Sequence, residues 1–171
     1  MVDNMIDKKD LKNKINELLE EHKTPSVQLG IIKDGEVLIN EGYGYRDYEN
    51  KIPANDDTIF AIGSTTKAFT GAAIAKLVSE GILEWDKPVK DYIPELQMYD
   101  EYVTKNLTVR DILCHRCGLP RHDLVWYLND YTIEDIMNKL KYLKPLTSFR
   151  QTLQYQNFMY TLAGHLIERV T

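Results

Sequence analysis

The sequence lacks the features that mark several special classes of protein. Only two of its 171 residues are cysteine, which is too few for a disulfide framework. No apolar run approaches the roughly 20 residues that a membrane-spanning helix needs, and the polar N-terminus is not typical of a signal peptide. These absences predict no membrane span and a cytoplasmic protein, or an extracytoplasmic one if a leader was removed.

Positive charge is also scarce, because 21 lysines and arginines face 26 acidic residues and leave a net charge of −5. No basic stripe with interleaved aromatic residues stands out, so nucleic acid is not an expected partner. Hydrophobic residues make up 43% of the chain and charged residues 27%, which is typical of a globular protein that buries a core. No internal repeat or linker is visible, and we expect one compact unit.

Hydrophobic spacing and turn residues predict a mixed α/β chain. Apolar residues at helical spacing predict an amphipathic helix over residues 6–22. Two strand-like runs, residues 27–32 and 36–44, meet at Asp34-Gly35, a dipeptide that favours a tight hairpin turn. Further helices are predicted over residues 64–80, 108–114, 133–142 and 158–170.

Two of these helices have informative ends or faces. Residues 64–80 are apolar almost all round and are followed by Gly81 as a stop signal, so we expect this helix to be buried. The helix over residues 133–142 begins after Thr132, which has Asp135 three residues further on, the spacing of an N-terminal cap.

A Ser-x-x-Lys pair, Ser64 and Lys67, opens the apolar helix. The two residues lie one turn apart on the same face, with the serine at the end where backbone N–H groups are free. The lysine faces the positive end of the helix dipole, and this placement together with partial burial favours an uncharged amine. Such an amine can accept the proton of the Ser64 hydroxyl, which predicts a nucleophile and its base. The alternative is a solvated lysine that happens to follow a capping serine.

A second polar motif, Tyr155-Gln156-Asn157, precedes the last predicted helix. A phenol beside a lysine can share the role of general base, and a carboxamide offers a donor and an acceptor to an acyl or amide substrate. The similar triplet Tyr48-Glu49-Asn50 precedes the serine in a turn-rich stretch, and we interpret it as structural. The second motif therefore strengthens the prediction of a site at Ser64.

Three blocks of the sequence together resemble a known family: "IFAIGSTTKAFTGAAIAKLVSEGILEWDKPVKDYIPEL", "LTVRDILCHRCGLPRHD" and "LQYQNFMYTLAGHLIERVT". They resemble successive blocks of the class C β-lactamase and penicillin-binding-protein-like serine hydrolases, and the resemblance extends from Pro25 onward. The class A pattern, with Ser-Asp-Asn as its second motif, is not present in the sequence. The resemblance implies an α/β fold of the α+β type, a sandwich of an antiparallel sheet and helices.

The resemblance also implies a role for each motif residue. Ser64 is then the acylated nucleophile, and Lys67 and Tyr155 share proton transfer. Asn157 orients the substrate amide and the lysine. The implied function is a serine acyl hydrolase that acts on a β-lactam, a D-amino-acid peptide or an ester through an acyl-enzyme, with no cofactor and no metal ion. The alternative is a non-catalytic binding or regulatory relative that keeps the fold.

The family's third motif, Lys-Thr-Gly or His-x-Gly on a later strand, is absent from the sequence. That strand normally supplies one oxyanion-hole donor and lines the substrate cleft, while the backbone N–H of Ser64 supplies the other. We therefore expect residues 1–171 to be the N-terminal part of a single β-lactamase-like domain and a poor or inactive catalyst alone. We also expect a homodimer or association with the missing C-terminal half, because apolar faces and a strand edge would lie uncovered.

The pair Cys114 and Cys117 raises the alternative of a redox or zinc site. Zinc would need two further ligands at good spacing, and a redox pair activates its first cysteine at a helix N-terminus, whereas this pair follows a short helix. We therefore interpret both cysteines as structural. His115, which lies between them, is interpreted as a helix C-terminal residue that hydrogen-bonds free carbonyl groups.

Overall fold

The structure is a computed structural model that describes residues 7–127 and 129–171. The sequence predicts one compact unit, but the chain divides into two compact units, Met1–Ala61 and Ile62–Thr171. That residues 1–171 are part of a single domain stays a prediction. In the described part of the chain, no helix is both long enough and apolar enough to cross a membrane.

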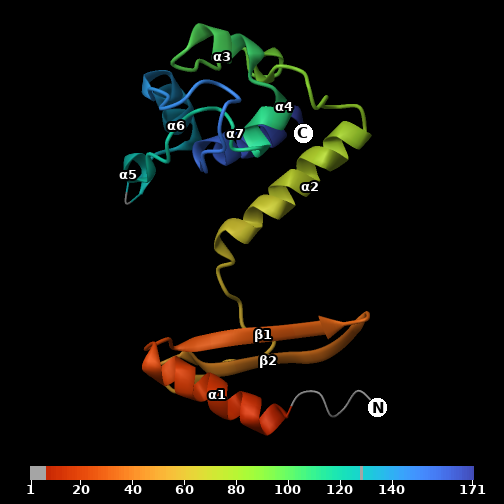
Figure 1. The fold of residues 1–171 in the computed structure, drawn as a ribbon, viewed down its shortest axis with the longest axis vertical. Coiled ribbons are helices and arrows are strands. Elements are labelled where there is room, and N and C mark those ends of the chain that lie inside the picture. Colours follow the sequence, from red (N-terminus) through yellow and green to blue (C-terminus); the bar gives the residue numbers. More distant parts are fainter. Residues whose placement is uncertain (1–6, 128) are drawn as a thin grey trace. The chain divides into compact units, whose positions relative to one another are not determined.

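The first unit is a small antiparallel sheet with one helix packed against strand β2 (Figure 1). Helix α1 (Lys8–Glu21) begins after Asp7, whose side chain accepts hydrogen bonds from two backbone N–H groups of the first turn. Three strands follow in the order β1-β2-β3: β1 (Ser26–Lys33), β2 (Glu36–Asp47) and β3 (Ile52–Pro53). The predicted amphipathic helix and hairpin are confirmed.

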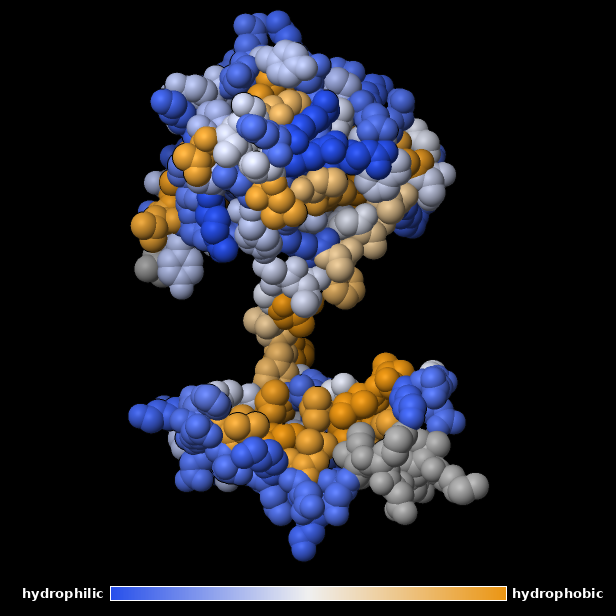
Figure 2. All heavy atoms as spheres, in the orientation of Figure 1, coloured by the Kyte–Doolittle hydropathy of each residue, from blue (hydrophilic) through white to orange (hydrophobic). Residues whose placement is uncertain are grey.

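The hairpin turn between β1 and β2 is tight because Asp34 and Gly35 both adopt left-handed backbone, with φ of 53° and 84°. The sheet buries Ile39 and Tyr43. Other apolar side chains of this unit lie at its surface (Figure 2), among them Ile32.

The second unit is helical (Figure 1). It begins with a 3-10 turn, η1 (Gly63–Thr65), that leads into helix α2 (Thr66–Ser79). The elements after α2 are η2 (Val89–Asp91), α3 (Glu101–Asn106), α4 (Val109–Leu113), α5 (Asp123–Trp126), α6 (Ile133–Lys139), η3 (Leu140–Tyr142) and α7 (Phe158–Val170). The helices predicted over residues 108–114, 133–142 and 158–170 are confirmed, and α6 together with η3 accounts for the second of them.

Helix α7 lies at the centre of the second unit, with α2, α4 and α6 packed against it. Most of its apolar face is completely buried: Phe158, Met159, Leu162, Ala163 and Leu166. Burial of each large apolar side chain contributes about 1.5–3 kcal/mol. The start of α7 is therefore held in place by the core, and so are the residues just before it.

Helix α2 is less buried than the sequence predicts. Ile74 and Leu77 are its buried residues, while the Phe69 side chain is 69% exposed. Helix α7 packs against α2 and covers part of its apolar surface, and the apolar positions that face elsewhere lie open. The predicted helix is confirmed, but its predicted burial on all sides is wrong.

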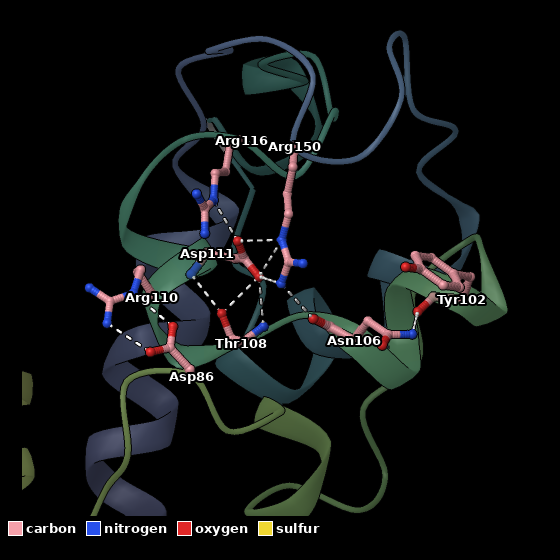
Figure 3. Close-up of polar contacts among 8 residues, drawn as sticks. All are labelled: Asp86, Tyr102, Asn106, Thr108, Arg110, Asp111, Arg116 and Arg150. Carbon is pink, nitrogen blue, oxygen red and sulfur yellow. Dashed lines mark hydrogen bonds and ion pairs between the residues drawn. The ribbon is translucent and has the colours of Figure 1, made fainter.

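A buried carboxylate ties the start of α4 to the loops that follow it (Figure 3). Asp111 and Thr108 cap the helix reciprocally, because each side chain accepts a hydrogen bond from the backbone N–H of the other residue. The same carboxylate accepts hydrogen bonds from Arg116 at 2.5 Å and Arg150 at 2.6 Å. Since the backbone N–H of Arg150 also donates to the carbonyl of Arg116, this network holds the segment next to His115 in place.

Candidate active site

Ser64 lies in η1, one residue before Thr65, which is the N-cap of α2. The sequence predicts a cap or first-turn position, whereas the structure gives the Ser64 side chain two other polar neighbours. Its Oγ lies 2.5 Å from the Tyr155 hydroxyl and accepts a hydrogen bond of 3.0 Å from Lys67 Nζ. Ser64 is exposed in this chain.

Lys67, in the first turn of α2, is held by two acceptors. Its Nζ donates to Ser64 Oγ and, at 2.9 Å, to Asn157 Oδ1. It also lies 4.8 Å from the centre of the Tyr155 ring, within the range of a cation–π contact. These contacts offset the unfavourable position of a cation near a helix N-terminus. The three-residue spacing places Ser64 and Lys67 on one face of the chain.

The segment Tyr155-Gln156-Asn157 is anchored by its middle residue. Gln156 is completely buried, and its Nε2 donates to the carbonyl of Pro120 at 2.7 Å. Its Oε1 accepts a hydrogen bond of 2.7 Å from the backbone N–H of Phe158, the first residue of α7. The flanking residues Tyr155 and Asn157 are thereby positioned to reach the start of α2.

The pKa of the Tyr155 phenol is lowered from its usual value of 10.0. The largest cause is the polar contact with the Lys67 ammonium, followed by the hydrogen bond with Ser64. The guanidinium of Arg121 lies 5.0 Å from the ring centre and adds a smaller electrostatic effect in the same direction. A lowered pKa makes the phenolate more available as a general base for the Ser64 proton.

Asn157 connects Lys67 to a carboxylate that sequence reasoning missed. Its Nδ2 donates to Asp123 Oδ1 at 3.2 Å, and Arg121 Nε donates to Asp123 Oδ2 at 2.6 Å. An ionised carboxylate only accepts hydrogen bonds, so Asp123 turns the amide NH₂ towards itself and the amide oxygen towards Lys67. Arg121 and Asp123 both lie in the block "LTVRDILCHRCGLPRHD". The resemblance of this block to the family was the signal in the sequence that could have pointed to them.

His115 also differs from its sequence-based interpretation. The ring does not cap α4: its Nδ1 accepts a hydrogen bond of 3.1 Å from the backbone N–H of Gln156. The ring also lies 4.6 Å, centre to centre, from that of Tyr155. The reason is tertiary, because packing of α4 against α7 brings the segment before α7 within reach of the residue after α4.

The two cysteines are free and differ in exposure. Cys114 is exposed, whereas Cys117 is buried, and burial raises the pKa of the Cys117 thiol. A raised pKa opposes formation of the thiolate that redox chemistry and metal binding require. Among residues 7–127 and 129–171, no three or more His, Cys, Asp or Glu side chains gather in a way that could hold a metal ion.

The structure thus brings all four predicted site residues together within the second unit. A serine hydroxyl lies within hydrogen-bond distance of a phenol and an amine, and a carboxamide oxygen accepts a hydrogen bond from that amine. The chain belongs to the Beta-lactamase family, which matches residues 11–171. This confirms the resemblance found in the sequence. The antiparallel sheet and helices are part of the β-lactamase/transpeptidase-like fold.

Several known proteins are similar to this chain. It is 32% identical over 172 residues to the unguisins hydrolase ungD' of Aspergillus campestris, covering 95% of this chain and 32% of that protein. The octameric penicillin-binding protein homologue from Pyrococcus abyssi matches with a TM-score of 0.82 and 32% identity, over 96% of this chain and 39% of that one. The D-amino acid amidase from Ochrobactrum anthropi matches with a TM-score of 0.71 and 28% identity, over 91% and 44%. The chain spans about a third of the length of the curated relatives it matches.

Proposed function

We propose that the protein containing this chain is a serine acyl hydrolase that forms an acyl-enzyme on Ser64. The observation that carries the proposal is the double contact of the Ser64 hydroxyl with Tyr155 and Lys67 at the start of a helix. Membership of the Beta-lactamase family and the hydrolase and amidase among the similar proteins support it.

In the proposed acylation step, Ser64 Oγ attacks the carbonyl carbon of the substrate while its proton passes to the phenolate form of Tyr155 or to the uncharged amine form of Lys67. Both groups lie within hydrogen-bond distance of the hydroxyl, and the lowered pKa of Tyr155 favours its phenolate as the acceptor. The tetrahedral intermediate expels the leaving nitrogen or oxygen, which takes up that proton, and an ester remains on Ser64. Water then attacks the ester with the same base, which releases the acid and restores the serine.

The proposed substrate is an acyl compound of one of three classes: a β-lactam, a D-amino-acid peptide or an ester. Asn157 is assigned two tasks, to hold Lys67 through Oδ1 and to orient the substrate amide. Its orientation against Asp123 suits the first task, because the amide cannot turn its NH₂ towards the lysine without losing the carboxylate.

The test is the intact mass of the whole protein that contains this chain, after incubation with a penicillin and, separately, with p-nitrophenyl acetate. We expect a covalent adduct that peptide mapping places on Ser64 and that Ser64→Ala abolishes. Ser79→Ala is the matched control, because Ser79 lies at the other end of α2 and donates to the carbonyl of Lys76. This control should keep the adduct.

An adduct on another residue, or ester turnover unaffected by Ser64→Ala, would contradict the assignment of the nucleophile. Absence of both adduct and turnover with either reagent would refute the hydrolase and favour the binding or regulatory relative.

A further inference from the structure

His115 contacts the Tyr155 segment at three points. Its backbone carbonyl accepts a hydrogen bond of 2.7 Å from the N–H of Gln154, one residue before Tyr155. Its Nδ1 accepts a hydrogen bond of 3.1 Å from the N–H of Gln156, one residue after. Its ring stacks on that of Tyr155 with a centre-to-centre distance of 4.6 Å and an interplanar angle of 32°. His115 therefore holds Tyr155 through the residue before it, through the residue after it, and through one face of the tyrosine ring.

The backbone of His115 is itself held in an uncommon conformation. Its φ is 55°, in the left-handed region that residues other than glycine rarely adopt. The residue follows Cys114, the C-cap of α4, so the left-handed turn ends the helix. A glycine or asparagine would satisfy that turn with less strain. Neither residue would place an aromatic ring with a hydrogen-bond acceptor against Tyr155. The histidine therefore makes contacts that are not needed to end the helix.

We propose that His115 is a positioning residue for the reaction at Ser64: its neutral ring holds the Tyr155 phenol against the Ser64 hydroxyl through the Gln156 N–H and the ring stack. This inference rests on the proposed function. It goes beyond the motif residues, because His115 touches neither Ser64 nor the reacting carbonyl and acts through Tyr155.

The role requires a neutral imidazole, because a protonated Nδ1 cannot accept the Gln156 hydrogen bond. Burial, and then the nearby Lys67 charge, lower the pKa of His115 from 6.5. The charged and titratable groups that face the ring are Lys67 on α2, Tyr155 before α7, and Tyr160 on α7, whose ring lies 5.3 Å away. Acidification therefore adds a second positive charge beside Lys67 and removes the acceptor of Gln156.

Two substitutions separate the two contacts of the ring. His115→Phe keeps an aromatic surface on Tyr155 but has no acceptor for the Gln156 N–H. His115→Asn keeps an acceptor and tolerates the left-handed backbone, but it loses the stack. His22→Phe is the matched control, because His22 is exposed at the end of α1 in the other unit.

The first measurement is independent of catalysis: a pH titration of the ¹⁵N-labelled protein by NMR. In the wild-type protein and in His22→Phe, the backbone amide signals of Tyr155 and Gln156 should move with the imidazole signal of His115, with a common midpoint below pH 6.5. In His115→Phe this movement should be absent. A Gln156 amide that ignores the titration of His115 would overturn the proposal.

The second measurement is the rate at which p-nitrophenyl acetate acylates Ser64, as a function of pH. The wild-type rate should fall below the same midpoint. His115→Phe should no longer show this fall in rate at low pH. At neutral pH it should be acylated about 10- to 100-fold more slowly, with little change in KM, because misplacing a reacting group by an ångström has an effect of this size. His115→Asn should also be slower, and His22→Phe should match the wild type.

The outcomes of the two measurements distinguish the two proposals. A His115→Phe protein with the wild-type rate and pH profile would refute the positioning role. Coupled NMR titrations in a wild-type protein that is never acylated would refute the proposed function, and would leave the contact between His115 and the Tyr155 segment supported without a role in a reaction.

Discussion

Replacing Asp111 with asparagine should lower the free energy of unfolding of the second unit by about 2–3 kcal/mol at pH 7. The carboxylate is completely buried and accepts hydrogen bonds from Thr108, Arg116 and Arg150 (Figure 3). Asparagine has a single acceptor oxygen and no charge, so it leaves the guanidinium groups without their counterion.

The magnitude follows from the pKa of Asp111. Burial by itself would raise this pKa, but hydrogen bonds from Arg150, Thr108 and Arg116 outweigh burial and lower the pKa from 3.8 to about 2. At about 1.4 kcal/mol per pKa unit, the ionised carboxylate contributes about 2 kcal/mol. Removing one partner of a fully buried pair costs about 3–5 kcal/mol. The two arginine side chains are 35% and 40% exposed, so water partly replaces the lost partner and the smaller figure applies.

The lowered pKa of Asp111 also determines how its contribution to the free energy of unfolding depends on pH. Because the folded-state pKa of Asp111 lies below its unfolded-state value, the contribution is present above about pH 4 and is lost as the pH falls through about 2. Asparagine binds no proton in this range. The stability difference between wild type and Asp111→Asn should therefore shrink by about 2 kcal/mol between pH 5 and pH 2.

Urea unfolding followed by tryptophan fluorescence measures this effect in the relevant unit, since both tryptophans of the chain, Trp85 and Trp126, lie in the second unit. Asp86→Asn is the matched control, because Asp86 pairs with Arg110 through two hydrogen bonds but is 73% exposed. Exposed pairs contribute little. Equal losses for Asp111→Asn and Asp86→Asn, or a difference from wild type that persists unchanged to pH 2, would refute the reasoning.

Three further results are expected. Asp123→Ala should slow acylation of Ser64 about tenfold while stability changes little, because Asn157 loses the carboxylate that orients its amide; an unchanged rate would argue against this. The acylation rate of the wild type should rise with pH, with a midpoint below pH 10, because the pKa of Tyr155 is lowered and its deprotonated form is the base. Tyr155→Phe should abolish this rise. A rise that persists in Tyr155→Phe would exclude the phenolate as the base. A thiol reagent should label exposed Cys114 first and buried Cys117 only on unfolding, and equal labelling rates would contradict the burial.

The sequence determined the features that depend on neighbouring residues. Asp34-Gly35 produced the expected hairpin turn, and Thr132 with Asp135 produced the expected helix cap. The Ser-x-x-Lys spacing placed Ser64 and Lys67 on one face at the start of a helix. Each of these follows from backbone geometry over one turn, and the resemblance to a family supplied the pairing with Tyr155.

Tertiary packing decided the rest of the site. Ser64 and Tyr155 are 91 residues apart in the chain, and their contact depends on α2 and the start of α7 lying side by side. The sequence could not show that His115 supports Tyr155, or that Asp123 orients Asn157, because these contacts join segments 41 and 34 residues apart. The sequence also could not show which faces of α2 are buried, because periodicity reports which faces of a helix are apolar, whereas burial depends on which other segments pack against them.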